Sequence, residues 1–356
     1  MFRETYKDAI SGYEKFWERK NSDRPVLNFA YEKKGGIPLK KPESLEQKWL
    51  DEEFIIENYK KFLTNVGYVA EGVPNLFTNL GPGSLAACIG GSYGLADNTI
   101  WFDEVKFITD WENPPEIAIN ENSKMWQNVL RLQKRYAKEP DINFSVADIG
   151  GIMDIIAALR STEDLLFDLY DYPDEVIAFS QKVKKLWYEA FNQQVESVKN
   201  HSGIYNTWMN IPSLKPWYPL QCDFCYMLSP EHFEKFVLGD LAEMANYLER
   251  SIYHLDGVGE LPHVDMLLDI NKLGGIQWTA GDGQAPLWDE KWYPLYKKIQ
   301  DKNKNIVLIG GVNENNIEGA ERLVKTLDPT GLYISADFTS REKAEDMAEK
   351  ITRWCE

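Results

Sequence analysis

The chain has 356 residues, of which 44% are apolar, and its 56 acidic residues outnumber the 39 basic ones, giving a net charge of −17. This composition allows one large domain with a sizeable core, and it argues against a nucleic-acid partner, because such partners are bound through lysine and arginine. No run of about 18 apolar residues and no signal-peptide pattern occurs, so we expect a cytoplasmic protein that does not span a membrane.

Residues 1–65 have the pattern of a helical extension with one extended piece, "RPVLNFAYE" (24–32). From residue 66 to 356, short apolar runs ending in Gly, Asn or Asp alternate with long amphipathic runs. Such alternation is typical of β–α units and a parallel sheet. We therefore expect a single-domain α/β protein, a (β/α)8 TIM barrel with residues 1–65 packed on it as an N-terminal helical extension. A doubly wound open sheet is the alternative.

The predicted strands share a short apolar run followed by a polar residue or glycine. In chain order they are "PVLNFA" (25–30), "YVAEGVP" (68–74), "INFSVAD" (142–148), "GIYNTWMN" (203–210), "SIYHLDG" (251–257), "GIQWTAG" (275–281), "NIVLIGG" (305–311) and "GLYISAD" (331–337). Barrel enzymes place their chemistry at the C-terminal ends of the strands. The polar residues that close these runs are therefore the candidate site residues.

The run "YHLDG" places His254 and Asp256 two positions apart, so in a strand they share one face. A histidine beside a carboxylate can bind a metal, act as a general base or hold a substrate, and the alternative is a buried histidine satisfied by its neighbour. Asp148 precedes two glycines, which allow close approach of a ligand, and is the third catalytic candidate. Asp337 has the same place at the end of the last run, where it can alternatively cap the next helix.

The substrate-binding candidates are Asp223, which lies within a CxxC segment, and six residues at or just after a predicted strand, Asn28, Asn206, Trp208, Trp278, Gly310 and Asp337. Trp208 and Trp278 predict an aromatic pocket, with core packing as the alternative. Cys222 and Cys225 form a lone CxxC pair without the second pair or the two histidines of a zinc site. We therefore expect ordinary reduced cysteines, with Asp223 as the functional residue of that segment.

Several segments occur in the order found in the uroporphyrinogen decarboxylase superfamily, and over most of residues 65–356 the chain resembles a divergent member. They are "VPNLFTNLGPGSLAACIGG", "FSVADIGGIMDIIAALRSTEDLLFDLYDYPDEV", "QCDFCYMLSPEHFEKFVLGDLAEMANYL", "SIYHLDG", "GGIQWTAG" and "NIVLIGGVN". That superfamily also contains cobalamin-dependent methyltransferases, which move methyl groups between corrinoid proteins and thiols. The resemblance implies a (β/α)8 barrel with its site at the strand C-termini.

The chain departs from both familiar branches of that superfamily. Uroporphyrinogen decarboxylases carry an "RQAGR"-like segment that binds substrate carboxylates, whereas this chain has "RPVLNFAYE" with the single Arg24. The zinc methyltransferases carry His-x-Cys and a later Cys, whereas this chain has His254-Leu-Asp256 and Ser335-Ala-Asp337. The resemblance therefore implies a candidate divalent-metal site, zinc for example, made of His254, Asp256 and Asp337, with harder ligands than thiolates.

These observations predict methyl or one-carbon transfer that involves a corrinoid protein or a methylated small molecule, with His254, Asp256 and Asp148 as catalytic residues. The first alternative is a cofactor-free decarboxylase, a lyase, acting on a porphyrinogen-like or other carboxylated substrate. The second is a small-molecule or corrinoid binding module without turnover. We expect a small-molecule substrate, and a corrinoid protein and a second copy of the chain are the candidate protein partners. The sequence leaves the natural substrate and the methyl donor open.

Overall fold

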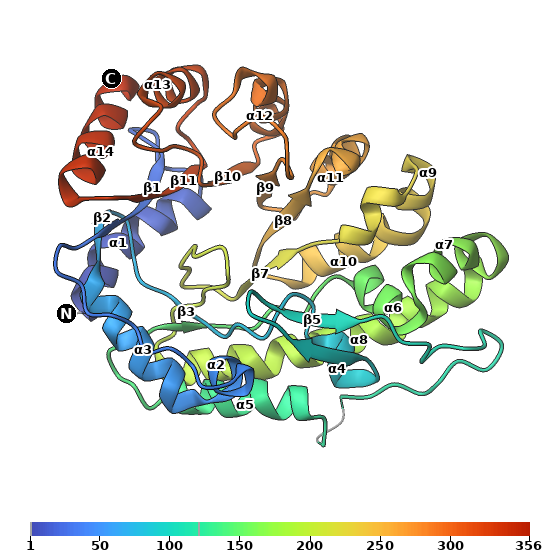
Figure 1. The fold of residues 1–356 in the computed structure, drawn as a ribbon. Helices are drawn as coiled ribbons and strands as arrows, with labels where there is room; N and C mark the ends of the chain where they lie inside the picture. Colours follow the sequence, from blue (N-terminus) through green and yellow to red (C-terminus); the bar gives the residue numbers. More distant parts are fainter. Residues whose placement is uncertain (1, 120–121) are drawn as a thin grey trace.

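A computed structural model of the chain describes residues 2–119 and 122–356. It is a mixed α/β structure whose main sheet has seven strands in the order β2-β1-β11-β10-β9-β8-β7. These strands are β1 (Val26–Glu32), β2 (Val66–Ala70), β7 (Trp217–Leu220), β8 (Arg250–Asp256), β9 (Gly275–Thr279), β10 (Asn305–Ile309) and β11 (Leu332–Phe338). Neighbours pair in parallel except β1 and β2, which are antiparallel. Figure 1 shows the strands following an arc with helices on its outer side.

Two small sheets complete the strand set. The strands β3 (Leu76–Phe77) and β6 (Phe144–Ser145) pair in parallel, and β4 (Ser92–Leu95) and β5 (Ile100–Asp103) form an antiparallel hairpin. Within the described residues, no continuous strand ladder joins the main sheet to the β3–β6 pair. The structure thus shows the α/β class with a parallel sheet, and its ladders do not show the closed barrel that the sequence predicted.

The helices lie between these strands in the chain, as expected for β–α units. The α-helices are α1 (Phe2–Trp17), α2 (Leu45–Leu50), α3 (Glu52–Asn65), α4 (Leu85–Ile89), α5 (Lys124–Tyr136), α6 (Ile152–Arg160), α7 (Thr162–Asp171), α8 (Pro173–His201), α9 (Pro230–Phe233), α10 (Gly239–Tyr247), α11 (Val264–Asp269), α12 (Tyr293–Asp301), α13 (Ile317–Thr326) and α14 (Arg341–Cys355). Four short elements are η1 (Asp223–Met227), η2 (Glu234–Leu238), η3 (Val258–His263) and η4 (Glu290–Trp292). Within the part of the chain that the structure describes, no helix has the length and apolar content needed to cross a membrane.

The predicted N-terminal extension contributes a strand to the main sheet. β1 lies between β2 and β11, so residues 26–32 belong to the same sheet as the C-terminal strands. α1 buries Tyr13 and Phe16 completely, and its Glu14 carboxylate accepts hydrogen bonds from the Arg250 guanidinium at 2.6 and 2.7 Å. Residues 26–32 thus share the main sheet, and α1 shares the core, with the rest of the chain.

The candidate site depends on where the predicted strands end. The runs at 25–30, 251–257, 275–281, 305–311 and 331–337 became β1, β8, β9, β10 and β11. The run at 203–210 contributes only an isolated bridge between Tyr205 and Ser213, and the run at 142–148 only the short β6. The sequence did not predict β7, because Pro219 argues against a strand, and the sheet accommodates this proline at its edge.

Candidate active site

The C-terminal half of β8 presents His254 and Asp256 on one face of the sheet. Their neighbours Tyr253 and Leu255 are buried on the opposite face, whereas His254 and Asp256 are half-buried. This arrangement follows from the two-residue period of a strand. In the adjacent β9, Gln277 pairs with His254 and Thr279 pairs with Asp256, so these four positions form one polar surface.

Asp223, Asp256 and His254 form a group that we call the site trio. One ligand atom from each side chain lies within 4.8 Å of those of the other two. Asp223 begins η1, the short element that follows β7, and β7 is the neighbour of β8 in the sheet. The connection after β7 thus brings a second carboxylate to the histidine, from a segment far away in the sequence.

The candidate ligands that the structure groups differ in one member from the set predicted from the sequence, because Asp337 does not belong to the trio. Asp337 lies on β11, and β9 and β10 separate that strand from β8. At about 4.8 Å per strand, side chains on β8 and β11 are about 14 Å apart along the sheet. Asp223, predicted as a substrate-binding residue, takes the place of Asp337, whose side chain is exposed.

A glutamine fixes the orientation of the His254 ring. The Nδ1 atom of His254 hydrogen-bonds to the Oε1 atom of Gln277, whose Nε2 group donates to Thr279 Oγ1 at 2.8 Å. An amide oxygen only accepts, so the proton of the neutral ring lies on Nδ1 and the lone pair on Nε2. The sequence gave no reason to single out Gln277, which lies in a buried apolar run, and only the pairing of β8 with β9 reveals its role.

Asp148 and Trp208, both predicted site residues, lie close to His254. The Trp208 ring meets the imidazole edge-on, with centroids 5.1 Å apart. The Asp148 carboxylate accepts hydrogen bonds from the Tyr218 hydroxyl at 2.9 Å and from the Gly150 N–H at 2.8 Å. Burial raises the pKa of Asp148, and these hydrogen bonds together with the charge of a protonated His254 oppose the rise.

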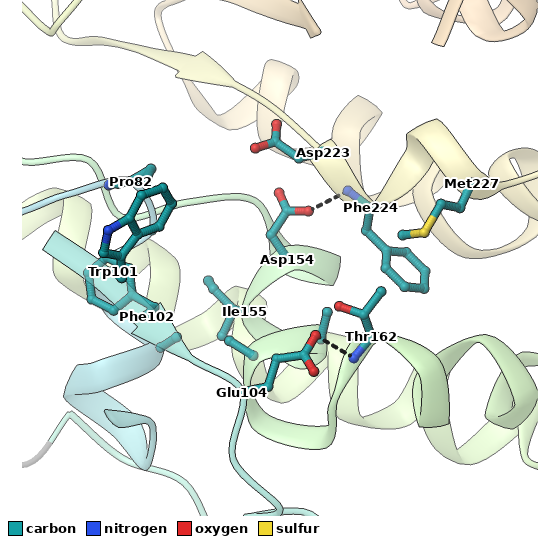
Figure 2. A pocket seen from close by; sticks show the side chains of 14 residues that line it. Pro82, Trp101, Phe102, Glu104, Asp154, Ile155, Thr162, Asp223, Phe224 and Met227 are labelled. Atoms are coloured by element: carbon teal, nitrogen blue, oxygen red, sulfur yellow. Dashed lines mark hydrogen bonds between the residues drawn. The ribbon is translucent and has the colours of Figure 1, made fainter. Parts of the chain in front are cut away.

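A further carboxylate, Asp154, was missed by the sequence reasoning. It lies in the first turn of α6, and its Oδ1 atom accepts the Phe224 N–H at 2.8 Å, beside Asp223 (Figure 2). Burial and then the charge of Asp223 raise the pKa of Asp154. Partial desolvation also raises the pKa of Asp223, and the charge of His254 opposes this rise. A lone acid in the apolar stretch "GGIMDII" was the signal available in the sequence.

Glu260 forms a hydrogen bond with the backbone of Asp256, a member of the trio. Its carboxyl group accepts hydrogen bonds from the Tyr253 hydroxyl at 2.8 Å and from the Asp256 backbone N–H at 3.3 Å. The side chain is fully buried, and this burial raises the pKa of Glu260 to about 9. A neutral Glu260 therefore holds the backbone at Asp256 near pH 7, a role that the sequence did not predict.

Trp278 lies away from the trio, contrary to the prediction that it lines the mouth. It is fully buried, and its ring packs against Trp292 with centroids 5.1 Å apart. The cause is again the two-residue period of the strand, because Gln277 points to the polar face and Trp278 to the other. Core packing, the alternative left open for this tryptophan, is what the structure shows.

Three other predicted binding residues have hydrogen-bond partners within the fold. The Asn28 amide donates to Tyr333 Oη at 2.9 Å and to the Asn210 carbonyl at 3.1 Å, and it accepts from the Val73 N–H. The Asn206 amide donates to Asn210 Oδ1 at 2.8 Å. The Gly310 N–H donates to the Ser335 carbonyl at 3.0 Å. The trio includes none of these three residues.

The two cysteines beside Asp223 were expected to be reduced, and the structure corrects this expectation. Cys222 and Cys225 form a disulfide, with their Cα atoms 5.4 Å apart. The tight turn of η1 allows this pairing, since Cα separations of about 4.4–6.8 Å suit a disulfide. The bridge encloses Asp223 and Phe224, so it closes the segment that carries one member of the trio.

A cavity of about 360 Å³ adjoins the trio and includes Asp154 and Asp223 in its wall (Figure 2). The hairpin of β4 and β5 contributes Trp101 and Phe102 to the other side of this cavity. Its size suits a small organic molecule. The sequence reasoning did not identify this hairpin or its aromatic residues as part of a site.

Comparison with known proteins supports the fold. No family model matches the sequence, and no curated protein matches it. Among solved structures, a methyltransferase from Methanosarcina mazei is similar, with a TM-score of 0.60 and 11% sequence identity over 98% of this chain and 99% of that chain. The two chains share a fold. At this level of identity, the likeness carries no residue-level statement about activity.

Proposed function

We propose that the protein is a methyl-transfer enzyme whose reaction centre is the site trio. The observation that carries the proposal is the convergence of one imidazole and two carboxylates within 4.8 Å, with the His254 ring oriented by Gln277. The fold shared with a methyltransferase and the sequence resemblance to a superfamily that includes cobalamin-dependent methyltransferases support the choice of reaction.

The strands form a barrel-like ring in this proposal, with the trio at its C-terminal mouth. Hydrogen bonds support this arrangement where the ladders stop. The Leu76 N–H donates to the Asn143 carbonyl at 3.0 Å, and the Val146 N–H donates to the Asn206 carbonyl at 3.3 Å. These contacts extend the β3–β6 pair towards the segment that precedes β7.

The trio fits a divalent metal. Imidazole nitrogens and carboxylate oxygens both bind zinc, and catalytic zinc sites use three protein ligands and keep a further position open for the reacting group. A zinc ion bound here would lower the pKa of a thiol or water ligand and so supply the nucleophile. Gln277 would hold the ring so that Nε2 faces the ion, and Glu260 would hold the backbone of Asp256.

The methyl donor in this proposal is a corrinoid protein, and the acceptor is a small molecule bound in the cavity beside Asp223. Asp148 lies close enough to His254 for the charges of the two groups to interact, so it would stabilise positive charge that develops around the ring. Trp208 covers the ring from the side and limits the access of water.

Metal binding tests the trio. We expect about one zinc per chain after loading and dialysis, measured by elemental analysis, because three preorganised ligands converge. His254→Ala and Asp223→Asn should each lower zinc affinity by at least about tenfold. Asp337→Asn is the matched control and should bind zinc as the unmodified protein does, because this carboxylate lies outside the trio. Full zinc affinity in His254→Ala would contradict the proposed metal site.

Methyl transfer tests the reaction itself. Mixing the zinc-loaded protein with methylcobalamin and a panel of small thiols should change the corrinoid absorbance spectrum and yield a methyl thioether. His254→Ala should abolish the change, whereas Asp337→Asn should not. Ligand binding without any product would instead favour the binding module that the sequence left open.

The arginines disfavour the decarboxylase alternative for a polycarboxylate substrate. Arg24 forms a bidentate salt bridge with Glu71, with nitrogen–oxygen distances of 2.7 and 2.8 Å. Arg160 forms a bidentate salt bridge with Asp168, with distances of 2.6 and 3.2 Å. Arg24 is the arginine of the "RPVLNFAYE" segment, and Arg160 is the last residue of α6, the helix that carries Asp154. Both guanidinium groups already have a carboxylate partner, so neither is free to bind a substrate carboxylate.

A further inference from the structure

The charged side chains that line the cavity beside the trio are all acidic among its described residues. Three carboxylate side chains line it, those of Glu104, Asp154 and Asp223. Among its described lining residues there is no lysine, arginine or histidine. Glu104 is exposed and accepts the Thr162 N–H at 3.0 Å, whereas Asp154 and Asp223 lie side by side (Figure 2). Two neighbouring carboxylates without a cationic partner in the lining favour a cation beside them.

One carboxylate oxygen in this cavity wall lacks a partner. Oδ1 of Asp154 accepts the Phe224 N–H, whereas Oδ2 is buried and has no hydrogen-bond partner among the described residues. Figure 2 shows the Asp154 carboxylate directed towards Asp223 from the first turn of α6. A buried, unsatisfied carboxylate oxygen is costly, and a cationic group in the adjoining cavity would stabilise the ionised carboxylate through its charge.

The cavity also has aromatic side chains in its lining. Trp101 and Phe102 from β5 lie across the cavity from Asp223, and Phe224 from η1 lies beside Asp154 (Figure 2), with Ala157, Ala158 and Met227 completing the apolar lining. Aromatic rings attract cations through their faces, and alkyl groups on the cation pack against apolar walls. This combination suits an organic ammonium better than a hydrated metal ion, which requires oxygen ligands on most sides.

We propose that this cavity binds the alkylated ammonium group of the small-molecule substrate. The inference deepens the proposed function, on which its catalytic meaning rests, by naming the substrate class. Asp223 belongs to both the trio and the cavity, so the bound group lies next to the reaction centre. The negative charges of Asp223 and Asp256 neutralise the charge of a divalent ion bound by the trio. The carboxylates of Asp154 and Glu104 are then left to attract the ammonium group.

Choline and its neutral carbon isostere 3,3-dimethylbutan-1-ol provide the test, since they have the same shape and differ in charge. Calorimetric titration of the full-length protein should show choline binding at least about tenfold tighter than the isostere. Asp154→Asn, which preserves shape and removes the charge, should reduce choline affinity by about tenfold and leave the isostere unchanged. Trp101→Leu, at an exposed ring, should also weaken choline binding.

The matched control is Asp141→Asn, the same change at an exposed aspartate outside the cavity, and it should bind choline like the unmodified protein. Equal affinity for choline and the isostere, or unchanged choline binding in both cavity variants, would overturn the inference. Because the assay measures binding without turnover, its failure is distinct from failure of the proposed function. Loss of zinc affinity in His254→Ala tests only the latter.

Discussion

At the scale of single residues, the site depends on groups that hold the reactive side chains in place. His254 and Asp256 each have one supporting partner, Gln277 for the ring and Glu260 for the backbone N–H. Such partners determine which atom of a ligand faces the centre, and removing them usually weakens a metal site without destroying it. Two predictions follow from this pair of contacts.

Gln277→Leu should weaken zinc binding because the leucine cannot accept the Nδ1 proton, so the imidazole is free to rotate and to change tautomer. We expect a loss of about 10- to 100-fold in zinc affinity, measured by competition with a chelating dye. Gln284→Leu, at an exposed glutamine outside the trio, is the control and should leave the affinity unchanged. An unchanged affinity in Gln277→Leu would show that the ring is held by other contacts.

Glu260 should make the protein less stable as the pH rises. Burial raises its pKa from an ordinary value of 4.5 to about 9, so between these values the folded chain holds a proton that the unfolded chain releases. The stabilisation linked to this proton is therefore lost as the pH rises through that window, by at most about 1.4 kcal/mol per pH unit. Glu260→Gln mimics the neutral acid, and urea unfolding at pH 5.5 and 8.5 should show a smaller difference than in the unmodified protein. Equal differences would contradict this role.

At the scale of elements, the sequence predicted the C-terminal strands well and the middle of the chain poorly. β8, β9, β10 and β11 are apolar runs whose burial and pairing agree with their local pattern. β7 contains Pro219, and β3 and β6 have two residues each, so nothing local in the sequence marks them. His254 and Asp256 came from the first kind of strand, and Asp223 was recognised only as a polar residue within the CxxC of Cys222 and Cys225.

The start of α6 shows how one backbone position supports the site. A Cβ atom at Gly151 would overlap the Gln221 carbonyl oxygen and the Asp154 carboxylate, because α6 here meets the segment that leads into η1. Gly151→Ala should lower the free energy of unfolding by about 1–3 kcal/mol and weaken choline binding, since Asp154 must move. Denaturant unfolding and calorimetry measure the two effects.

Gly239→Ala is the matched control for that substitution. Gly239 begins α10 with helical backbone angles, and nothing lies within 4 Å of an added Cβ. We expect this variant to be as stable as the unmodified protein or more stable by about 0.5–1 kcal/mol, because alanine is the better helix former. Equal losses in both variants would mean that Gly151 has no special packing role.

At the scale of the whole molecule, the site is assembled from segments that no local pattern relates. The trio and its cavity combine β8, η1, α6 and the β4–β5 hairpin, and β1, near the N-terminus, pairs with β11, near the C-terminus. Sequence periodicity gives the face of each element but not its neighbours, which is why Asp337 was grouped with His254 and Asp154 was overlooked.

Unfolding experiments can show whether α1 is an independent extension or part of the main core. A dispensable extension would detach before the sheet unfolds, whereas a helix that completes the core unfolds with it. Phe16 is fully buried and contacts the rings of Trp17 and Tyr333, with centroids 5.5 and 6.0 Å apart. Phe16→Ala should therefore lower the free energy of global unfolding by about 3–5 kcal/mol. Fluorescence and circular dichroism should report the same single unfolding transition. Lys15→Ala, at the exposed neighbouring position, should change it by less than about 0.5 kcal/mol. An early, separate loss of helix signal in Phe16→Ala would restore the view of α1 as an independent extension.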